Sequence, residues 1–285
     1  MNFAEAWKQI EAKDDRPSRL RSTRTLPWEE FRQDVAEQGG EFVRSIVSSL
    51  YHGDILILRN AFTREFMREL KEKTVAWTRS RPESFHKMLD GVPDFHRQID
   101  METGKKYSVL ACKHSAYFFR WNDDPLGIWS AITERWSVLK VAMGLHADEY
   151  ERNIPSDGPT DRIQVVRYLP KYGYLEPHVD AWQNQRCFIS GYMSKRGEDF
   201  HGGGFYGVDA NNNVIDLEDR IEVGDLAIGY ASVCHGVAPC DRHKEPDWNA
   251  TDGRWFLGLY SNDPDTGKPR VTVQPEKLDL PGVLP

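Results

Sequence analysis

Apolar residues in the first half of the chain follow the spacing of amphipathic helices. Between about 126 and 145 they recur at intervals of three and four, at Ile128, Ile132, Trp136, Leu139 and Met143. This spacing places them on one face and predicts a long helix there. Thr63 stands as a cap before a run of helix-forming residues and predicts a second helix. A third helix is expected over about 3–12.

Strand-like patterns dominate the chain after residue 160. Short runs rich in β-branched and aromatic residues alternate there with clusters of Gly, Pro and Asn. The expected strands cover 162–168, 186–193, 204–208, 220–223, 226–230 and 254–260, and an earlier one covers 54–59. Many short strands after a mainly helical region predict a β-sandwich or barrel with helices packed outside it. We expect one domain over 1–285, with a helical, lid-forming region over 1–150 and a metal-binding β core over 151–285.

Composition narrows the class of protein. Of the 285 residues, 39% are hydrophobic and 12% are aromatic, which suits a globular chain with a substantial core. The formal net charge of −7 argues against a general nucleic-acid surface. No apolar run reaches the ~20 residues that span a bilayer, and the first residues lack the apolar stretch of a secretory signal. The four cysteines form no C-x-x-C pair. We therefore expect a cytoplasmic protein without membrane or nucleic-acid partners.

One short motif carries the strongest chemical signal. His178 and Asp180 are two residues apart, and His235 follows 57 residues later. On an extended chain, residues i and i+2 point to the same side, so His178 and Asp180 can bind one ion together. Two histidines and one carboxylate leave coordination positions open, as in non-haem Fe(II) enzymes. A structural zinc site is instead closed by four protein ligands.

The residues around this motif resemble a known family. The segments 164–170 (QVVRYLP) and 174–180 (YLEPHVD) resemble the strand pair that precedes the metal in Fe(II)/2-oxoglutarate-dependent oxygenases, especially the prolyl-hydroxylase-like ones. The resemblance continues through 202–206, 223–230, 234–239 and 253–260, and covers about residues 161–262. It implies an α+β chain built on a double-stranded β-helix, a jelly-roll or cupin-like barrel. Flanking helices would come mostly from the N-terminal half.

The resemblance also implies roles for individual residues. His178, Asp180 and His235 would hold Fe(II), Arg254 would bind the far carboxylate of 2-oxoglutarate, and Tyr168 would donate to the same carboxylate. A guanidinium suits this task because it offers two parallel donors to two oxygens.

The sequence departs from the family pattern near the arginine. The residue two positions after Arg254 is Phe256, where many members have a hydroxyl. The spacing of 19 residues from His235 to Arg254 is longer than usual, through an insertion at 241–253. Arg242 or Lys244 therefore remain alternatives for the carboxylate.

The reaction implied by the resemblance converts 2-oxoglutarate and dioxygen into succinate and CO2 while a substrate C–H bond is oxidised. Hydroxylation is the usual outcome, although desaturation or cyclisation is also open, and Asp180 disfavours halogenation. We expect a small metabolite such as an amino acid, nucleoside or natural-product intermediate, with Trp182 in its pocket. The long segment 82–107 is expected to help cover the barrel mouth.

Two alternatives stay open. One is a protein or peptide side-chain hydroxylase of the same family, and the other is a non-catalytic cupin-type barrel that binds a metal or ligand. Arg254 and Tyr168 separate the second alternative from an oxygenase, because a barrel without co-substrate has no need for them. Neither oligomeric state nor the position oxidised follows from the sequence.

Overall fold

The computed structural model describes residues 1–266, 273–278 and 280. Within this part, the helices are α1 (Phe3–Glu11), α2 (Trp28–Glu37), α3 (Gly40–Tyr51), α4 (Arg64–Arg79), α5 (Met101–Gly104) and α6 (Trp129–Ala142). The strands are β1 (Ser22–Pro27), β2 (Asp54–Arg59), β3 (Phe95–Ile99), β4 (Ala111–Phe119), β5 (Thr160–Tyr168), β6 (Tyr174–Val179), β7 (Cys187–Tyr192), β8 (Gly204–Val208), β9 (Val214–Asp216), β10 (Leu226–Tyr230), β11 (His235–Ala238), β12 (Arg254–Asn262) and β13 (Gln274–Pro275).

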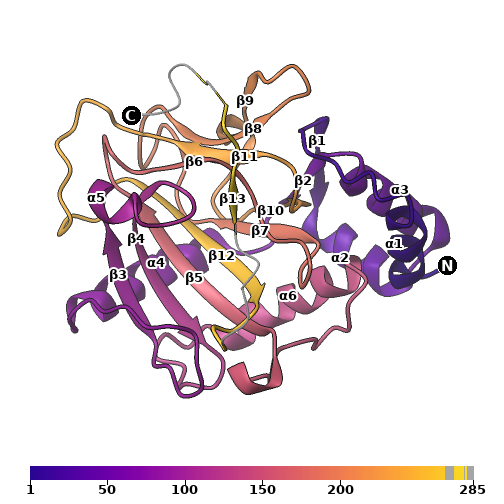
Figure 1. The fold of residues 1–285 in the computed structure, drawn as a ribbon, viewed down its shortest axis with the longest axis horizontal. Helices are drawn as coiled ribbons and strands as arrows, with labels where there is room; N and C mark the ends of the chain where they lie inside the picture. Colours follow the sequence, from indigo (N-terminus) through magenta and orange to yellow (C-terminus); the bar gives the residue numbers. More distant parts are fainter. Residues whose placement is uncertain (267–272, 279, 281–285) are drawn as a thin grey trace.

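The strands form two layers that share one strand. The larger layer has the order β1-β2-β10-β7-β12-β5-β4, with β3 added beside β4, and the smaller layer has the order β6-β11-β8-β9, with β13 beside β6. Strand β4 belongs to both layers (Figure 1): Ala111 and Cys112 pair with β6, and the residues from His114 onward pair with β5. The two layers enclose the barrel interior, and the expected double-stranded β-helix with flanking helices is confirmed.

Helices cover one end of the larger layer. In Figure 1, α1, α2 and α3 (indigo) gather beside β1 and β2, at the opposite side of the molecule from β3 and α5. Trp7 of α1 is fully buried, donates to the Ala142 carbonyl at the end of α6 (2.8 Å), and packs against Tyr230 of β10. One side chain thus joins two helices to the sheet. No helix in the described part of the chain is both long and apolar enough to cross a membrane.

The expected helices are present at the predicted positions. In α6, Ile132, Trp136 and Leu139 are all buried, which confirms the apolar face predicted from their spacing. Thr63 caps α4 by accepting a hydrogen bond from the backbone N–H of Phe66.

One expected strand is wrong. Residues 220–223 form no strand, and Glu218–Arg220 make a short 3-10 turn instead. The Asp225 carboxylate accepts a hydrogen bond from the Glu222 N–H, and Gly224 has φ +98°. These two features curl the backbone into a tight turn, so its N–H groups are not presented to a neighbouring strand. The first 120 residues also contribute β1, β3 and β4 to the sheet, and none of these three strands was expected.

Candidate metal centre

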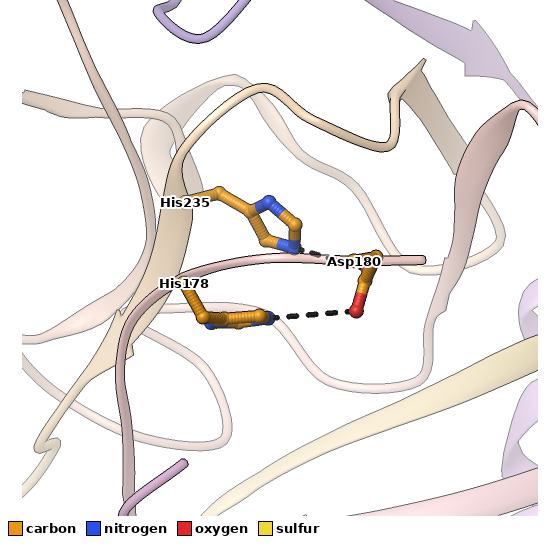
Figure 2. Close-up of side chains that lie close together, drawn as sticks. All are labelled: His178, Asp180 and His235. Carbon is orange, nitrogen blue, oxygen red and sulfur yellow. Dashed lines mark ion pairs between the residues drawn. The ribbon is translucent and has the colours of Figure 1, made fainter. Parts of the chain in front are cut away.

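The three predicted metal ligands converge at the junction of two strands of the smaller layer. His178 of β6 lies directly opposite His235 of β11 in the antiparallel pairing, and Asp180 follows β6. Figure 2 shows both imidazoles directed at the Asp180 carboxylate: Nε2 of His178 lies 3.8 Å from Oδ1, and Nε2 of His235 lies 3.6 Å from Oδ2. One donor atom from each of the three residues lies within 4.8 Å of the other two. Strand pairing therefore brings together residues 57 positions apart.

Backbone carbonyls fix the tautomer of both histidines. Nδ1 of His178 lies 2.8 Å from the Glu176 carbonyl, and Nδ1 of His235 lies 2.9 Å from the Val233 carbonyl. A carbonyl can only accept a hydrogen bond, so each Nδ1 carries a proton, and in the neutral form of such an imidazole Nε2 keeps its lone pair. This arrangement is typical of metal-binding histidines.

The protonation states also suit a metal. His178 is 3% exposed, and its burial lowers the pKa, with the neighbouring His235 acting in the same direction. The imidazole is then neutral at pH 7, the form that binds a metal. Burial raises the pKa of Asp180, while His235 and Lys113 oppose this effect. A divalent cation at the site would favour the carboxylate further. Two imidazoles and one carboxylate thus fit Fe(II).

Arg254 lies deep in the barrel, at the start of β12 and opposite Tyr168 of β5. It is 2% exposed, and its Nε donates to Oε2 of the buried Glu218 at 2.9 Å. The guanidinium carbon lies 5.4 to 5.8 Å from the ring centroids of Tyr168, Tyr192 and Phe256. Arg254 is therefore an interior cation that already has one anionic partner.

Three polar atoms beside Arg254 have no hydrogen-bond partner among the residues that the structure describes. They are the hydroxyl oxygens of Tyr168 and Tyr192 and the Oε1 atom of Glu218, all buried. Buried polar groups in folded proteins are nearly always satisfied, so such a cluster indicates room for a polar ligand or ordered water. The sequence did not single out Tyr192 or Glu218. Tyr192 shares the inward side of β7 with Phe188, which contacts His235. Glu218 lies in the 3-10 turn Glu218–Arg220, for which the sequence carries no functional signal.

A cavity of about 220 Å³ opens beside the metal ligands. His178 and Asp180 line it, together with Lys113 of β4, Arg162 of β5 and Tyr260 of β12. Burial lowers the pKa of Lys113 to about 8, and the charge of Arg162 adds to this effect. Ile99 and Tyr107, from the long segment expected near the barrel mouth, also line the cavity.

The structure places the remaining predicted residues elsewhere. Trp182 is not among the residues that line the cavity, and the Arg16 guanidinium lies 3.8 Å above its ring. Arg242 and Lys244 are exposed, and Lys244 approaches Asp241 and Asp252 at 3.8 Å. These two residues lie on the surface, so Arg254 is the basic residue of this region that faces the barrel interior.

Comparisons by sequence identify no relative: no family model and no curated protein matches the chain. Comparison by structure does find similar folds. A prolyl-4-hydroxylase from Pseudomonas putida superposes with a TM-score of 0.50 at 13% identity, covering 77% of this chain and 98% of that one. A full-length protein from Neurospora crassa, solved in complex with alpha-KG, gives 0.50 at 12% identity, with 84% of each chain covered. The chain therefore has the fold of the Fe(II)/2-oxoglutarate oxygenases that its sequence resembles.

Proposed function

We propose that the chain is an Fe(II)- and 2-oxoglutarate-dependent dioxygenase that hydroxylates a C–H bond of a small metabolite, releasing succinate and CO2. The observation that carries this proposal is the geometry of His178, Asp180 and His235. Both Nε2 atoms face one carboxylate, and both Nδ1 atoms are held by backbone carbonyls. A ligand set of this kind leaves positions open for exogenous ligands.

The surroundings of Arg254 support 2-oxoglutarate as co-substrate. Its Nε is used by Glu218, which leaves the terminal Nη atoms to form the two parallel donors that a carboxylate accepts. The unpartnered Tyr168 and Tyr192 hydroxyls are further donors beside the same guanidinium. We assign the far carboxylate of 2-oxoglutarate to Arg254 with Tyr168, as the family resemblance implies. Tyr192 is a second hydroxyl donor beside the same guanidinium.

When bound, Fe(II) and 2-oxoglutarate would supply the oxidising chemistry, with dioxygen as the second co-substrate. The chain's own residues orient the metal through His178, Asp180 and His235 and orient the co-substrate through Arg254. The aromatic rings of Phe188 and Phe205 pack against His235 and would keep water from that side of the site. Exclusion of water protects a reactive centre from side reactions.

The cavity supports a small substrate in preference to a protein side chain. Its volume of about 220 Å³ suits a compact metabolite, and part of its lining comes from the segment before β4, which acts as a cover. Arg254 is paired with Glu218, and the nearby hydroxyls of Tyr168 and Tyr192 have no hydrogen-bond partner among the described residues. This cluster argues against a non-catalytic barrel, because a barrel without co-substrate has no need for it.

One anaerobic titration tests the proposal. Protein mixed with Fe(II) and 2-oxoglutarate should develop the weak visible charge-transfer band of the chelated metal. A variant that keeps the charge balance, Arg254→Met with Glu218→Gln, should need at least about 10-fold more 2-oxoglutarate for the same band, since a charged hydrogen bond contributes about 1.5–3 kcal/mol. If iron binds and the band never forms, the proposal is wrong.

A further inference from the structure

The charges of the metal centre and of Arg254 do not balance those of the co-substrate. Nε of Arg254 donates to the buried Glu218 carboxylate at 2.9 Å, so this pair carries no net charge. A ferrous ion with Asp180 carries one positive charge, because histidines bind a metal as neutral imidazoles. 2-Oxoglutarate brings two carboxylates. One negative charge therefore remains, and a buried charge is costly unless a group of opposite sign lies beside it.

The uncompensated charge is that of the far carboxylate. The carboxylate nearer the metal offsets the positive charge there, whereas the charge of Arg254 is already offset by Glu218. The hydroxyls of Tyr168 and Tyr192 can donate hydrogen bonds, but burial raises the pKa of both, so they stay neutral. A second cation within reach of Arg254 would complete the balance.

Strand pairing brings Lys113 to this end of the barrel. In the antiparallel pairing of β4 with β5, His114 lies opposite Arg167. The preceding residue, Lys113, therefore comes level with Tyr168, and Tyr168 lies opposite Arg254 of β12. Residues level with one another on neighbouring strands point to the same side of the sheet. Two strand spacings separate the Cα atoms of Lys113 and Arg254 by about 10 Å.

Lys113 also comes between Arg254 and the metal-binding strands. The strand order β12-β5-β4-β6-β11 places β4 between the strand that carries Arg254 and the two strands that carry the histidines. Lys113 lines the cavity beside the metal ligands, and no described carboxylate lies within 4.0 Å of its ammonium. Arg162, the other cation of this lining, is six residues from Tyr168 along β5, or about 20 Å.

We infer that Lys113 binds the far carboxylate of 2-oxoglutarate together with Arg254, and supplies the positive charge that Glu218 offsets. This inference rests on the proposed function, because the charges are counted with iron and co-substrate bound. Lys113 then makes the site selective for a dicarboxylate over a 2-oxo acid with an apolar end.

Calorimetric titration of protein loaded anaerobically with Fe(II) tests this inference, since no turnover occurs without dioxygen. The two probes are 2-oxoglutarate and 2-oxopentanoate, which has the same chain but ends in a methyl group. Lys113→Met should weaken 2-oxoglutarate binding by about 10- to 100-fold, the range expected for a charged hydrogen bond. It should leave the affinity for 2-oxopentanoate nearly unchanged. Equal losses for the two probes would place Lys113 at the metal end of the co-substrate and overturn the inference.

A second substitution tests the charge balance itself. Glu218→Gln keeps an acceptor oxygen for Arg254 and removes the negative charge. Adding it to Lys113→Met should therefore recover most of the lost affinity for 2-oxoglutarate. Lys113→Arg should keep most of the affinity, and Lys8→Met, at an exposed position of α1, should change nothing. The inference is overturned if Lys113→Met binds 2-oxoglutarate like the wild type, or if the double variant recovers nothing.

Two further measurements keep these outcomes distinct. Thermal unfolding shows whether each variant is folded, and Lys113→Gln takes the place of Lys113→Met if the latter is not, with the same expected results. The charge-transfer band is recorded first on the wild type, and its absence with iron bound removes the oxygenase proposal whatever Lys113 does. A wild-type band with unchanged 2-oxoglutarate affinity in Lys113→Met removes only the role of Lys113.

Discussion

Gly204 leaves the space that the Glu218 side chain fills. A Cβ built on Gly204 would lie 2.6 Å from both Cγ and Oε2 of Glu218, and Gly204 has φ +107°. The same Oε2 accepts hydrogen bonds from the Phe205 N–H and from Nε of Arg254. The last glycine of the run 202–204 therefore allows a buried carboxylate to hold the arginine in place.

Substituting Gly204 should disturb both stability and co-substrate binding. Gly204→Ala should lower the free energy of unfolding by about 1–3 kcal/mol, because of its positive φ and the displaced Glu218. It should also weaken 2-oxoglutarate binding, since Arg254 loses its orienting partner. Gly202→Ala is the matched control, because Gly202 also has positive φ (+65°) but nothing lies within 4 Å of its Cβ position. Equal losses of stability and of affinity in the two variants would contradict the role given to Glu218.

Removing the metal-binding carboxylate should abolish hydroxylation. Asp180→Ala takes away the group that both Nε2 atoms face, and iron affinity should fall by at least about 10-fold. Iron content after dialysis and the charge-transfer titration measure the loss. Asp148→Ala, at an exposed turn position, should bind iron like the wild type. Full activity of Asp180→Ala would exclude Asp180 as a ligand.

Much of the metal centre could be predicted because its signals are local. The i, i+2 spacing of His178 and Asp180 and the glycine after His235 are visible in the chain itself. Pairing of His178 with His235 then follows from the strand order. The β core was predicted on the same grounds, since its strands are short, regular and bounded by turn residues.

The missed features depend on contacts between distant segments. Glu218 is an acidic residue in a polar turn, and only the fold reveals that it is buried against Arg254. Strand β4 was missed because its sequence mixes charged and apolar residues, as expected for a strand with one side facing a polar cavity. Trp182 was expected near the substrate from i, i+2 alternation after Asp180. β6, however, ends at Val179, so the alternation does not continue.

Asp54 should stabilise the fold in a pH-dependent way. Burial acts to raise its pKa, but hydrogen bonds from Arg21, Ser49 and Ser22 outweigh burial and lower the pKa from 3.8 to about 2. Because the pKa of Asp54 is lower in the folded state than its ordinary value of 3.8, the ionised carboxylate stabilises the folded state at pH values above 3.8. This stabilisation is lost as the pH falls toward 2.

Asp54→Asn should therefore cost about 1–2 kcal/mol at pH 7 and progressively less below pH 4. Urea unfolding at pH 7 and pH 3 measures the difference. Asp148→Asn serves as the exposed control, and a loss at pH 3 as large as that at pH 7 would contradict the assignment.

A buried ion pair ties α6 to the larger layer. Lys140 of α6 pairs with Asp161 of β5, and both are almost completely buried. Lys140→Met should cost about 3–5 kcal/mol, because it leaves Asp161 without a charge partner. The double variant Lys140→Met, Asp161→Asn should recover part of this loss, as a double-mutant cycle in urea would show. Simple addition of the two single losses would mean that the pair is not coupled.

Because β4 pairs with both layers of the barrel, it carries Lys113 at the seam between them. The pairing of His178 with His235 is set by β6 and β11, and β3 with its connection to β4 takes no part in that pairing. Redesign of Tyr107, Ser108 or Val109 in the β3–β4 connection would thus change the cavity lining without altering the pairing of His178 with His235. The choice of substrate then becomes adjustable from outside β6 and β11.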